Sequence, residues 1–558
     1  MVADTYTYDF IIVGSGGGSA PAALVMQEAG KRVLIIEKEA MIGGTSAFSG
    51  GVIWIPNNHI INDTGDGDSH ERSREYLDGV IGEVGPASTP ARRDAFIREG
   101  AAMIRFLEGR GMKFEHAHWP DYYDNYPGGL PTGRSLAAPL FDVNELGEWA
   151  PKLAYHPVTS LLPISSPESV DMFTATRTIK GKILLAKLLY RQFVLKKLLG
   201  KELRGAGNAM QGRLYQIVLR ESIPIWTETP ARDLLVEDGR VVGVVAERGG
   251  ETIQLRAELG VLLNAGGFAR NKAMREKYQK KPTSASWTQV SPGHTGEMIQ
   301  AAERIGAAID LMDETFWLAC SFHPDGTFGG MHSPNDIGKP HCIVVGRNGK
   351  RFANEAANYM LFGQKMYEAG AVPAWAIFDS RHRKYYPWGL LAPRITPKRV
   401  IDSGYLKKAA TLDQIARLCD IEPRGLAATV KGFNKFCEMG IDEDFHRGET
   451  AYNRYYGDPT VKPNSNLGPI EKPPFYAVQI WPGDVGTAGG VVCDEFSRVL
   501  RRDGSVIPGL YATGITTATV AGRSYPGAGA SVGPSMTFGY IAARHATRML
   551  QPPITAGA

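Results

Sequence analysis

The N-terminal region reads as a strand, a glycine-rich turn, a helix and a second strand. An apolar run at 9–13 is followed by Gly14-Ser15-Gly16-Gly17-Gly18-Ser19-Ala20, a helical pattern through residue 29 and a second apolar run at 32–36. Glycine lets the chain bend tightly at position 14. At position 16 it lets a pyrophosphate approach the backbone, at the positive end of the helix. This order of elements predicts the opening of a doubly wound α/β fold that binds a dinucleotide.

Glu37 and several further turns narrow the choice of cofactor. Glu37 ends the second strand, where its carboxylate can accept hydrogen bonds from ribose hydroxyls and disfavours a 2′-phosphate. Small residues and hydroxyls cluster at 42–51, 265–267 and 509–514, which is more than a nicotinamide site usually needs. The third fingerprint position is Ser19, and glycine-rich turns also occur as plain loops. The pattern predicts FAD, with glycines that only pack helices on strands as the alternative.

The domain organisation is inferred from changes in residue composition and in strand and helix patterns along the chain. A strand-rich passage at 215–267 ends in glycines and extends the first sheet. From about 311 to 484 the sequence is mixed and aromatic-rich, with helical patterns at 412–418 and 426–436, before strand and glycine-turn patterns return. We therefore predict an α/β protein with a discontinuous, Rossmann-like FAD-binding domain at 1–310 and 485–558. An α+β capping domain at 311–484, which completes the catalytic site, is inserted into it.

A helical insertion at about 160–212 carries an unusual concentration of positive charge. Residues 177–204 contain nine lysines and arginines and one acid, Glu202, interleaved with large apolar residues. Such a helix can lie on an anionic membrane surface. The more ordinary interpretation is a helix that packs on its own domain and leaves its lysines in water. Both interpretations stay open at this stage.

Composition excludes several classes of function. The chain has 558 residues, enough for two to four domains, and its 62 basic and 58 acidic residues nearly balance, so nucleic acid is not an expected partner. The five cysteines show no CxxC spacing, which argues against a disulfide framework and against a metal site. Residues 1–4 lack the features of a signal peptide, and no apolar run reaches spanning length. We expect a cytoplasmic protein, with or without membrane association.

The chain resembles the fumarate reductase/succinate dehydrogenase class of flavoproteins and, within it, the 3-ketosteroid Δ1-dehydrogenases. The resemblance runs nearly end to end and rests on the motifs at 14–18, 43–47, 120–123 (Pro-Asp-Tyr-Tyr), 133–135, 354–355, 486–490 and 525–527 (Tyr-Pro-Gly). It implies a non-covalent FAD. The residues expected to bind FAD are Gly14, Gly16, Gly17, Glu37, Lys38, Gly43, Gly44, Thr45, Ser46, Ser49, Gly50, Gly51, Ala265, Gly266, Gly267, Asn354, Glu355, Gly514, Ser531 and Val532.

The same resemblance implies the catalytic residues. Tyr122 would assist Tyr359, which removes a proton from C2 of the steroid, while Tyr525 and the amide of Gly529 hold the C3 carbonyl oxygen and hydride passes from C1 to flavin N5. The physical logic is independent of the family, because protons next to a ketone leave only when donors stabilise the enolate oxygen. A phenol with a pKa of about 10 is a poor base at neutral pH, so Tyr359 needs activation.

Some assignments are less specific than these. Tyr123 and Tyr126 lie close to Tyr122 and compete with it for the helper role. Met331 and His332 fall in a region that lines the family's pocket, but the local match is poor and they receive no role. The insertion makes this chain longer than compact family members between 152 and 212, so the preferred ring substituents cannot be predicted.

The nearest alternative is an enzyme of small dicarboxylates. Fumarate reductases place a histidine before their Gly-Gly turn and an arginine where this chain has Tyr525, whereas here the turn at 484–490 has no histidine. A phenol in place of a guanidinium removes the bidentate carboxylate clamp, which favours a neutral ketone. A ketosteroid dehydrogenase acting at C4–C5 and a non-catalytic flavin or lipid carrier are further alternatives. The expected partners are a 3-ketosteroid and an unidentified electron acceptor such as a quinone.

Overall fold

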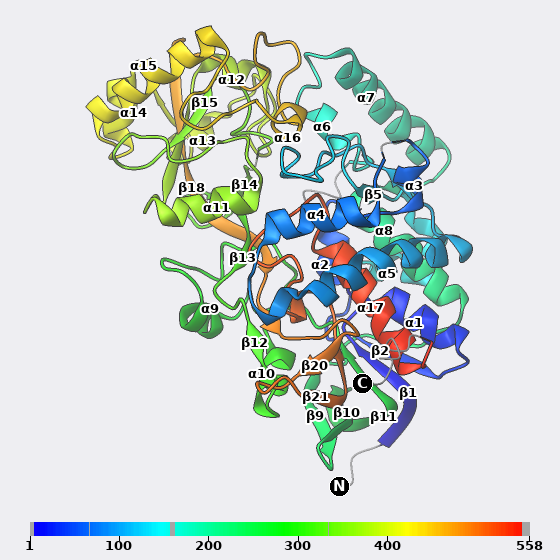
Figure 1. Ribbon diagram of the computed structural model, residues 1–558. Coiled ribbons are helices and arrows are strands. Elements are labelled where there is room, and N and C mark those ends of the chain that lie inside the picture. Colours follow the sequence, from blue (N-terminus) through cyan, green and yellow to red (C-terminus); the bar gives the residue numbers. More distant parts are fainter. Residues whose placement is uncertain (1–4, 66, 157–161, 333, 550–558) are drawn as a thin grey trace.

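The computed structural model describes residues 5–65, 67–156, 162–332 and 334–549 (Figure 1). Residues 1–4 and the first positions of the predicted insertion, 160–161, lie outside these ranges. Two main sheets organise the protein, one near the chain ends in Figure 1 and one in the green to orange part of the ribbon. The chain is thus of the predicted mixed α/β class, whereas the exact domain boundaries stay predictions.

The first sheet has eight strands in the order β20-β21-β11-β1-β2-β8, with β10 and β9 continuing from β11. Strands β21, β11, β1, β2 and β8 are parallel. Residues 10–13 of β1 are buried and all apolar because both faces of the sheet are covered, each by its own core cluster. The strands are β1 (Thr5–Val13), β2 (Val33–Ile36), β8 (Ile225–Trp226), β9 (Ala231–Glu237), β10 (Arg240–Arg248), β11 (Glu251–Leu263), β20 (Arg498–Leu500) and β21 (Val506–Ala512).

Helices cover this sheet, and α1 packs against α17, the last helix of the described chain. The helices and 3-10 turns of this part are α1 (Ser19–Glu28), α2 (Gly44–Phe48), α3 (His59–Asn62), α4 (His70–Ile81), η1 (Pro86–Ser88), α5 (Pro90–Gly109), η2 (Val143–Lys152), α8 (Ala206–Arg220), α9 (Lys272–Tyr278), α10 (Glu297–Arg304), η4 (Gly514–Thr516) and α17 (Val532–Ala546). Small sheets join β3 (Val52–Trp54), β5 (Ser135–Ala137) and β4 (Glu115–His116), then β6 (Phe141–Asp142) and β7 (Leu203–Arg204), and β12 (Ile309–Asp310) and β19 (Gly490–Val491).

The second sheet is antiparallel, in the order β14-β13-β18-β16-β15 with β17 beside β18. Its strands are β13 (Thr315–Phe322), β14 (Phe328–Met331), β15 (Cys342–Val345), β16 (Ala374–Phe378), β17 (Lys407–Ala409) and β18 (Phe475–Thr487). Its helices are α11 (Tyr359–Glu368), α12 (Ser380–Tyr385), α13 (Lys398–Asp402), α14 (Leu412–Leu418), α15 (Pro423–Met439) and α16 (Ala451–Tyr455). Helices α14 and α15 confirm the two predicted helical patterns, while the predicted boundary at 484 falls inside β18.

The insertion forms α6 (Ser169–Met172), α7 (Ile179–Tyr190) and a π-helical continuation, η3 (Arg191–Leu198), at the upper right of Figure 1. Leu184 and Leu188 of α7 are buried, and Arg191 pairs with Glu168 at 2.7 Å. Arg177 forms an ion pair with Asp458, which links the insertion to the loop after α16. Within the described ranges, no helix has the length and apolarity needed to cross a bilayer.

Candidate active site

A cavity of about 830 Å³ lies at the carboxyl ends of the parallel strands, the edge where open α/β sheets bind ligands. Its wall includes Val13 and Ile36, which end β1 and β2, and residues of the second sheet and α6. Eighteen of the residues predicted for the site line it: Gly14, Gly16, Glu37, Lys38, Gly44, Thr45, Ser46, Ser49, Gly50, Tyr122, Ala265, Gly266, Tyr359, Gly514, Tyr525, Gly529, Ser531 and Val532. The structure thus brings the predicted cofactor turns and the predicted catalytic residues to one cavity.

The glycine-rich turn at 14–18 is held against Glu37. Gly14 has φ +98°, and a Cβ there would lie 2.2 Å from the carbonyl oxygen of Asn264, so only glycine fits. Glu37 Oε2 accepts hydrogen bonds from the amide of Ser15 at 3.0 Å and from its hydroxyl at 2.5 Å. Burial raises the pKa of Glu37, and the amide of Glu39 and both Ser15 donors oppose that rise. The carboxylate therefore fixes the turn as well as facing the cavity.

His294 is a cavity residue that sequence reasoning missed. Its Nε2 lies 2.9 Å from Thr45 Oγ1, and its Nδ1 accepts a hydrogen bond from the amide of Gly267 at 3.4 Å. Burial, together with the positive charges of Lys38 and Arg270, lowers the pKa of His294 to about 3. The ring is therefore neutral and donates from Nε2 to Thr45. A single histidine in a glycine-containing loop carries no spacing signal that would have identified it.

The cavity wall fits FAD on the protein's own features. No side chain caps α1, so the positive end of this helix faces the glycine turn, although the Ser19 amide is bound by Gly16 O at 3.0 Å and Pro21 has no amide hydrogen. Glu37 supplies acceptors at the end of β2, and Thr45 and Ser46 supply hydroxyls at the start of α2. Lys38 also lines the cavity, but its amine is bound by Thr295 at 2.6 Å and by Glu297 at 2.9 Å. Among the described residues, the pattern is that of a pyrophosphate and ribose site whose one lysine is already paired.

Six of the predicted FAD residues do not line the cavity. Gly17, Gly43, Gly51 and Gly267 belong to the cofactor turns but do not line the cavity. Asn354 and Glu355 lie in a separate cluster, where Asn354 Nδ2 donates to Asn453 at 2.9 Å and Glu355 binds Arg351 at 2.7 Å and Arg447 at 3.0 Å. These contacts hold the second sheet to its loops. They give Asn354 and Glu355 a structural role instead of a contact with the cavity.

Three tyrosines from distant parts of the chain meet at the cavity. Tyr122 lies in the loop between β4 and β5, Tyr359 begins α11, and Tyr525 lies in the loop before α17. Their ring centroids are 5.6 Å apart for Tyr122 and Tyr359, 5.2 Å for Tyr359 and Tyr525, and 5.5 Å for Tyr122 and Tyr525. Tyr123 and Tyr126 do not line the cavity. Of the adjacent competitors, Tyr122 is thus the one that reaches the site.

The turn at 524–531 brings a phenol and a backbone amide to one place. Gly529 has φ +92°, and a Cβ there would lie 2.2 Å from the carbonyl oxygen of Val52, so the turn packs tightly on β3. The Tyr525 hydroxyl lies 3.0 Å from Ser531 Oγ. Burial raises the pKa of Tyr525, and hydrogen bonds from the Ser531 side chain and from the amides of Ser531 and Gly529 oppose that rise. Both donors of the predicted oxyanion pair therefore point to the same region.

A network of hydrogen bonds joins this turn to the loop that carries Tyr122. The amide of Tyr122 donates to Pro526 O at 2.9 Å, and the Tyr76 hydroxyl donates to the same oxygen at 2.6 Å. Asp121, next to Tyr122, accepts from Trp54 Nε1 at 2.8 Å and forms an ion pair with fully buried Arg134. The positions of Tyr122 and Tyr525 are therefore coupled through a buried polar network.

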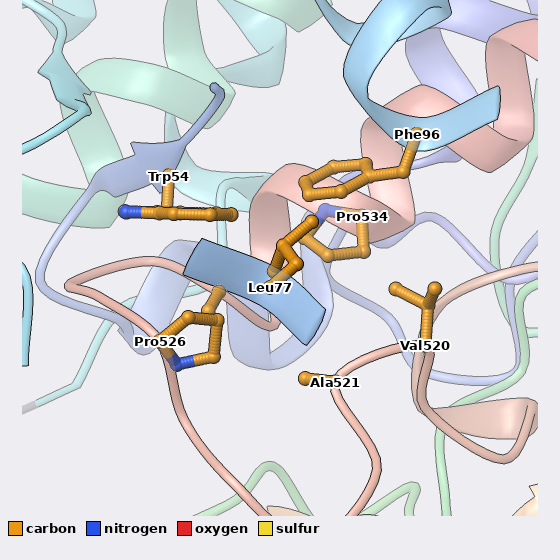
Figure 2. Close-up of a pocket in the computed structure, with 8 residues that line it drawn as sticks. Trp54, Leu77, Phe96, Val520, Ala521, Pro526 and Pro534 are labelled. Atoms are coloured by element: carbon orange, nitrogen blue, oxygen red, sulfur yellow. The ribbon is translucent and has the colours of Figure 1, made fainter. Parts of the chain in front are cut away.

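The back of the turn packs on apolar side chains. Figure 2 shows Trp54, Phe96, Pro526 and Pro534 around a void of about 10 Å³ with no polar lining surface. A void of that size holds about one water-sized probe, and an apolar one stays dry. The catalytic side of the turn is polar, and its support is close-packed and apolar.

Burial raises the pKa of Tyr122 and Tyr359 well above the usual phenol value. The neighbouring phenols Tyr122 and Tyr525 raise the pKa of Tyr359 further. All three tyrosines are therefore protonated at neutral pH, and a base role for Tyr359 requires loss of its own proton. Tyr359 is hydrogen-bonded to both Tyr122 and Tyr525, and both hydrogen bonds raise its pKa.

Comparisons with known proteins agree with this geometry. The family described as FAD binding domain matches residues 9–532. A 3-oxosteroid 1-dehydrogenase from Mycobacterium tuberculosis (strain ATCC 25618 / H37Rv) is 39% identical, over 96% of this chain and 98% of the relative. A 4-oxocyclohexanecarboxylate 2-dehydrogenase from Sinomonas cyclohexanicum is 33% identical, over 96% of this chain and 92% of the relative.

A solved structure is similar over the whole fold. It is a crystal structure of 3-ketosteroid delta1-dehydrogenase from Sterolibacterium denitrificans in complex with 1,4-androstadiene-3,17-dione. The two chains are 37% identical, the TM-score is 0.91, and the match covers 98% of this chain and 100% of the other. FAD is therefore the cofactor of this protein. The chain belongs to the FAD binding domain family of flavoproteins and, within it, to the 3-oxosteroid 1-dehydrogenases.

Proposed function

We propose that this protein dehydrogenates a 3-ketosteroid between C1 and C2. The observation that carries the proposal is the meeting of Tyr122, Tyr359 and Tyr525 at a cavity whose other wall is built from FAD turns. Relatives named 3-oxosteroid 1-dehydrogenase, and a similar structure solved with a steroid dienedione, support the same substrate class.

In this proposal Tyr525 and Gly529 hold the C3 oxygen. The Tyr525 hydroxyl and the Gly529 amide supply two donors, and Ser531, 3.0 Å from that hydroxyl, orients it. Donors fixed before the reaction stabilise the charge that develops on the oxygen as the C2 proton leaves. The C2 hydrogen thereby becomes acidic enough for a weak base to remove it.

Tyr359 is the proposed base, and its chemistry depends on its environment. Its pKa lies well above 10 because of burial and two neighbouring phenols, so only a small fraction is deprotonated at neutral pH. That small fraction is a strong base, and a hydrogen bond from Tyr122 can stabilise it. When bound, FAD supplies the acceptor for the hydride that leaves C1. Gly14, Gly16 and Glu37 are proposed to hold FAD without a covalent bond.

The charge of the cavity favours a neutral ketone over a carboxylate. Among the described residues that line it, Lys38 is the one lysine or arginine, and Glu297 pairs with its amine at 2.9 Å. The lining histidines, His156 and His294, both have a lowered pKa because they are buried. A carboxylate needs a cationic or multiply donating partner to offset its desolvation. This observation supports a steroid over a dicarboxylate or a cyclohexanecarboxylate.

Anaerobic mixing of the FAD-loaded protein with a 3-keto-4-ene steroid tests the proposal. We expect rapid bleaching of the flavin absorbance and one 1,4-diene product per flavin. No bleaching with any steroid of a panel would contradict it. Bleaching only with ring-A-saturated 3-ketosteroids, giving a 4-ene product, would favour dehydrogenation at C4–C5.

We also propose that residues 177–204 contact a membrane surface. Large apolar side chains of α7 and η3 face solvent, with Ile179 78% exposed, Leu189 61% and Leu198 76%. Exposed lysines lie between them, among them Lys187, Lys196 and Lys197. A helix that only packs on its own domain would turn its apolar residues inward, and here Leu184 and Leu188 already do so. The outward apolar residues and lysines suit anionic lipid, and a lipid-soluble acceptor such as a quinone would fit this location.

Co-sedimentation with vesicles tests this contact. We expect the protein to pellet with anionic vesicles, less at high salt, and the double variant Leu189→Ser/Phe193→Ser to pellet several-fold less. Leu418→Ser removes a similarly exposed leucine from α14 and should behave as the wild type. Equal pelleting of all three proteins, or none of the wild type, would contradict the proposal.

A further inference from the structure

A hydrogen-bonded group of three side chains, Thr45, Ser291 and His294, lies in the wall of the cavity. Thr45 belongs to the segment 44–46 and the other two to the segment 291–294, and every residue of both segments lines the cavity. FAD is the cofactor of this protein, so the hydrogen bonds that this group offers to the cavity bear on how the cofactor is held. They are independent of the carbon atoms at which the steroid is oxidised.

The His294 ring is held in one orientation and carries its hydrogen on Nε2. The residue is 7% exposed, and the ring packs so closely on Gly266 that a Cβ there would lie 2.9 Å from it. Nδ1 lies 3.4 Å from the amide of Gly267, and an amide only donates, so Nδ1 carries no hydrogen. Burial and the positive charges of Lys38 and Arg270 lower the pKa of His294 to about 3. The ring is therefore neutral, and its one hydrogen is on Nε2.

Thr45 accepts two hydrogen bonds from donors that the fold fixes in place. His294 Nε2 lies 2.9 Å from Thr45 Oγ1, and the backbone amide of Ser291 donates to the same oxygen at 3.0 Å. A hydroxyl has two acceptor sites and one hydrogen. Because both acceptor sites are occupied, the Thr45 hydrogen is left to donate. The opposite tautomer of His294 would reverse this, since a bare Nε2 would itself take the Thr45 hydrogen.

The hydroxyls of Thr45 and Ser291 together keep one hydrogen that is not used inside the protein. Thr45 Oγ1 lies 3.3 Å from Ser291 Oγ and donates to it in the protein alone. Ser291 then keeps its own hydroxyl hydrogen, which finds no acceptor in the part of the chain that the structure describes. Whether Thr45 donates directly or through Ser291, the pair has one donor left for a molecule in the cavity that both residues line.

We propose that His294 is a positioning residue that makes the Thr45 and Ser291 hydroxyls a hydrogen-bond donor to bound FAD. FAD offers phosphate oxygens, carbonyl oxygens and ring nitrogens as acceptors, and a buried hydroxyl is stabilised by such a partner. His294 acts by fixing the direction of the Thr45 hydrogen. The loss of one hydrogen bond of this kind weakens binding by roughly tenfold.

Two substitutions at His294 separate the donor from the ring. His294→Gln places an amide nitrogen near the position of Nε2 and keeps a donor for Thr45, whereas His294→Phe keeps a flat ring without a donor. The dissociation constant of FAD is measured by diluting the holoenzyme and quantifying the free flavin by its fluorescence after ultrafiltration. We expect this constant to rise by roughly tenfold in His294→Phe and by less than about threefold in His294→Gln. Equal constants in His294→Phe and the wild type, or equal rises in both variants, would overturn the inference.

His382→Phe is the matched control for the loss of a buried histidine. His382 is also fully buried, its pKa is lowered to about 3 by burial, and its Nε2 lies 3.0 Å from the carbonyl oxygen of Asp336, but it does not line the cavity. This variant should lose a free energy of unfolding similar to that lost by His294→Phe and keep the wild-type dissociation constant of FAD. A rise as large as that of His294→Phe would show that FAD release reports general destabilisation, which would overturn the specific role.

A double-mutant cycle tests whether His294 acts through Thr45. In Thr45→Val the hydroxyl is absent, so the further change His294→Phe should raise the dissociation constant of FAD by less than about twofold. A full tenfold rise in that background would overturn the route through Thr45. The midpoint potential of the bound flavin in His294→Phe then locates the acceptor. The potential should fall if the hydrogen is donated to the flavin ring, whose reduced form gains electron density, and stay unchanged if it is donated to the pyrophosphate. A rise in the potential would contradict the loss of a donor.

Discussion

The Tyr525 hydroxyl and the Gly529 amide are the two donors proposed to hold the C3 oxygen. Replacing Tyr525 by phenylalanine removes the first of them. The ring keeps its packing against Phe316 and Tyr359, whose ring centroids lie 5.3 Å and 5.2 Å from its own, so the shape of the cavity is preserved. Ser531 loses one hydrogen-bond partner, which should lower the free energy of unfolding by about 1 kcal/mol. The transition state loses one of two oxyanion donors, which typically costs about 3 kcal/mol, or 10²- to 10³-fold in rate.

Stopped-flow reduction of the flavin by a 3-keto-4-ene steroid measures that rate directly, and its concentration dependence gives the dissociation constant. We expect the limiting rate to fall by about two to three orders of magnitude while steroid affinity changes by less than about tenfold. Tyr511→Phe is the control, because this tyrosine also makes one hydrogen bond of 3.0 Å, to His545, but does not line the cavity. The Tyr511→Phe protein should lose a similar free energy of unfolding and keep the wild-type rate of flavin reduction. A weaker steroid affinity with an unchanged rate in Tyr525→Phe would refute the oxyanion role of the Tyr525 hydroxyl. Tyr525 would then only line the pocket.

Three further outcomes test the same account. Gly529→Ala would force a Cβ into the backbone of β3, so we expect flavin reduction to fall by at least about 10²-fold with FAD retained; a normal rate would refute the amide's role. Because the active form of Tyr359 is deprotonated and its pKa is raised, the rate of flavin reduction should rise about tenfold per pH unit between pH 7 and 9, and a flat profile would contradict the base assignment. Arg134→Leu leaves Asp68 and Asp121 buried without their cation and should cost about 3–5 kcal/mol in denaturant unfolding; a loss below about 1 kcal/mol would show that the network does not hold the Tyr122 loop.

The parts of the site that were predictable are those that local chemistry requires. Gly14 and Gly529 adopt left-handed backbone conformations, and Tyr359 and Tyr525 belong to specific motifs, whereas the motif around Tyr122 offered Tyr123 and Tyr126 as competitors. What the motifs could not supply was contact between segments distant in the chain. Glu355 matches a family motif, yet in the folded chain Arg447 binds it, and no local pattern predicts that pairing.

Other features were missed because they depend on contacts that the folded chain makes between distant residues. No spacing of residues in the sequence indicates such contacts. His294 faces Thr45, which lies 249 positions away in the sequence. The basic helix was ambiguous in sequence because its apolar residues surround it, and only burial separates the inward leucines from the outward ones.

The most direct test of the central claim is single-turnover flavin reduction by Tyr359→Phe. The substitution removes the proposed base and keeps a ring of the same shape, so the account predicts a full complement of FAD and steroid affinity within a few-fold of the wild type. It also predicts a reduction rate lower by about 10²- to 10⁴-fold, the usual contribution of a general base. A rate near that of the wild type, with the same 1,4-diene product, would contradict it.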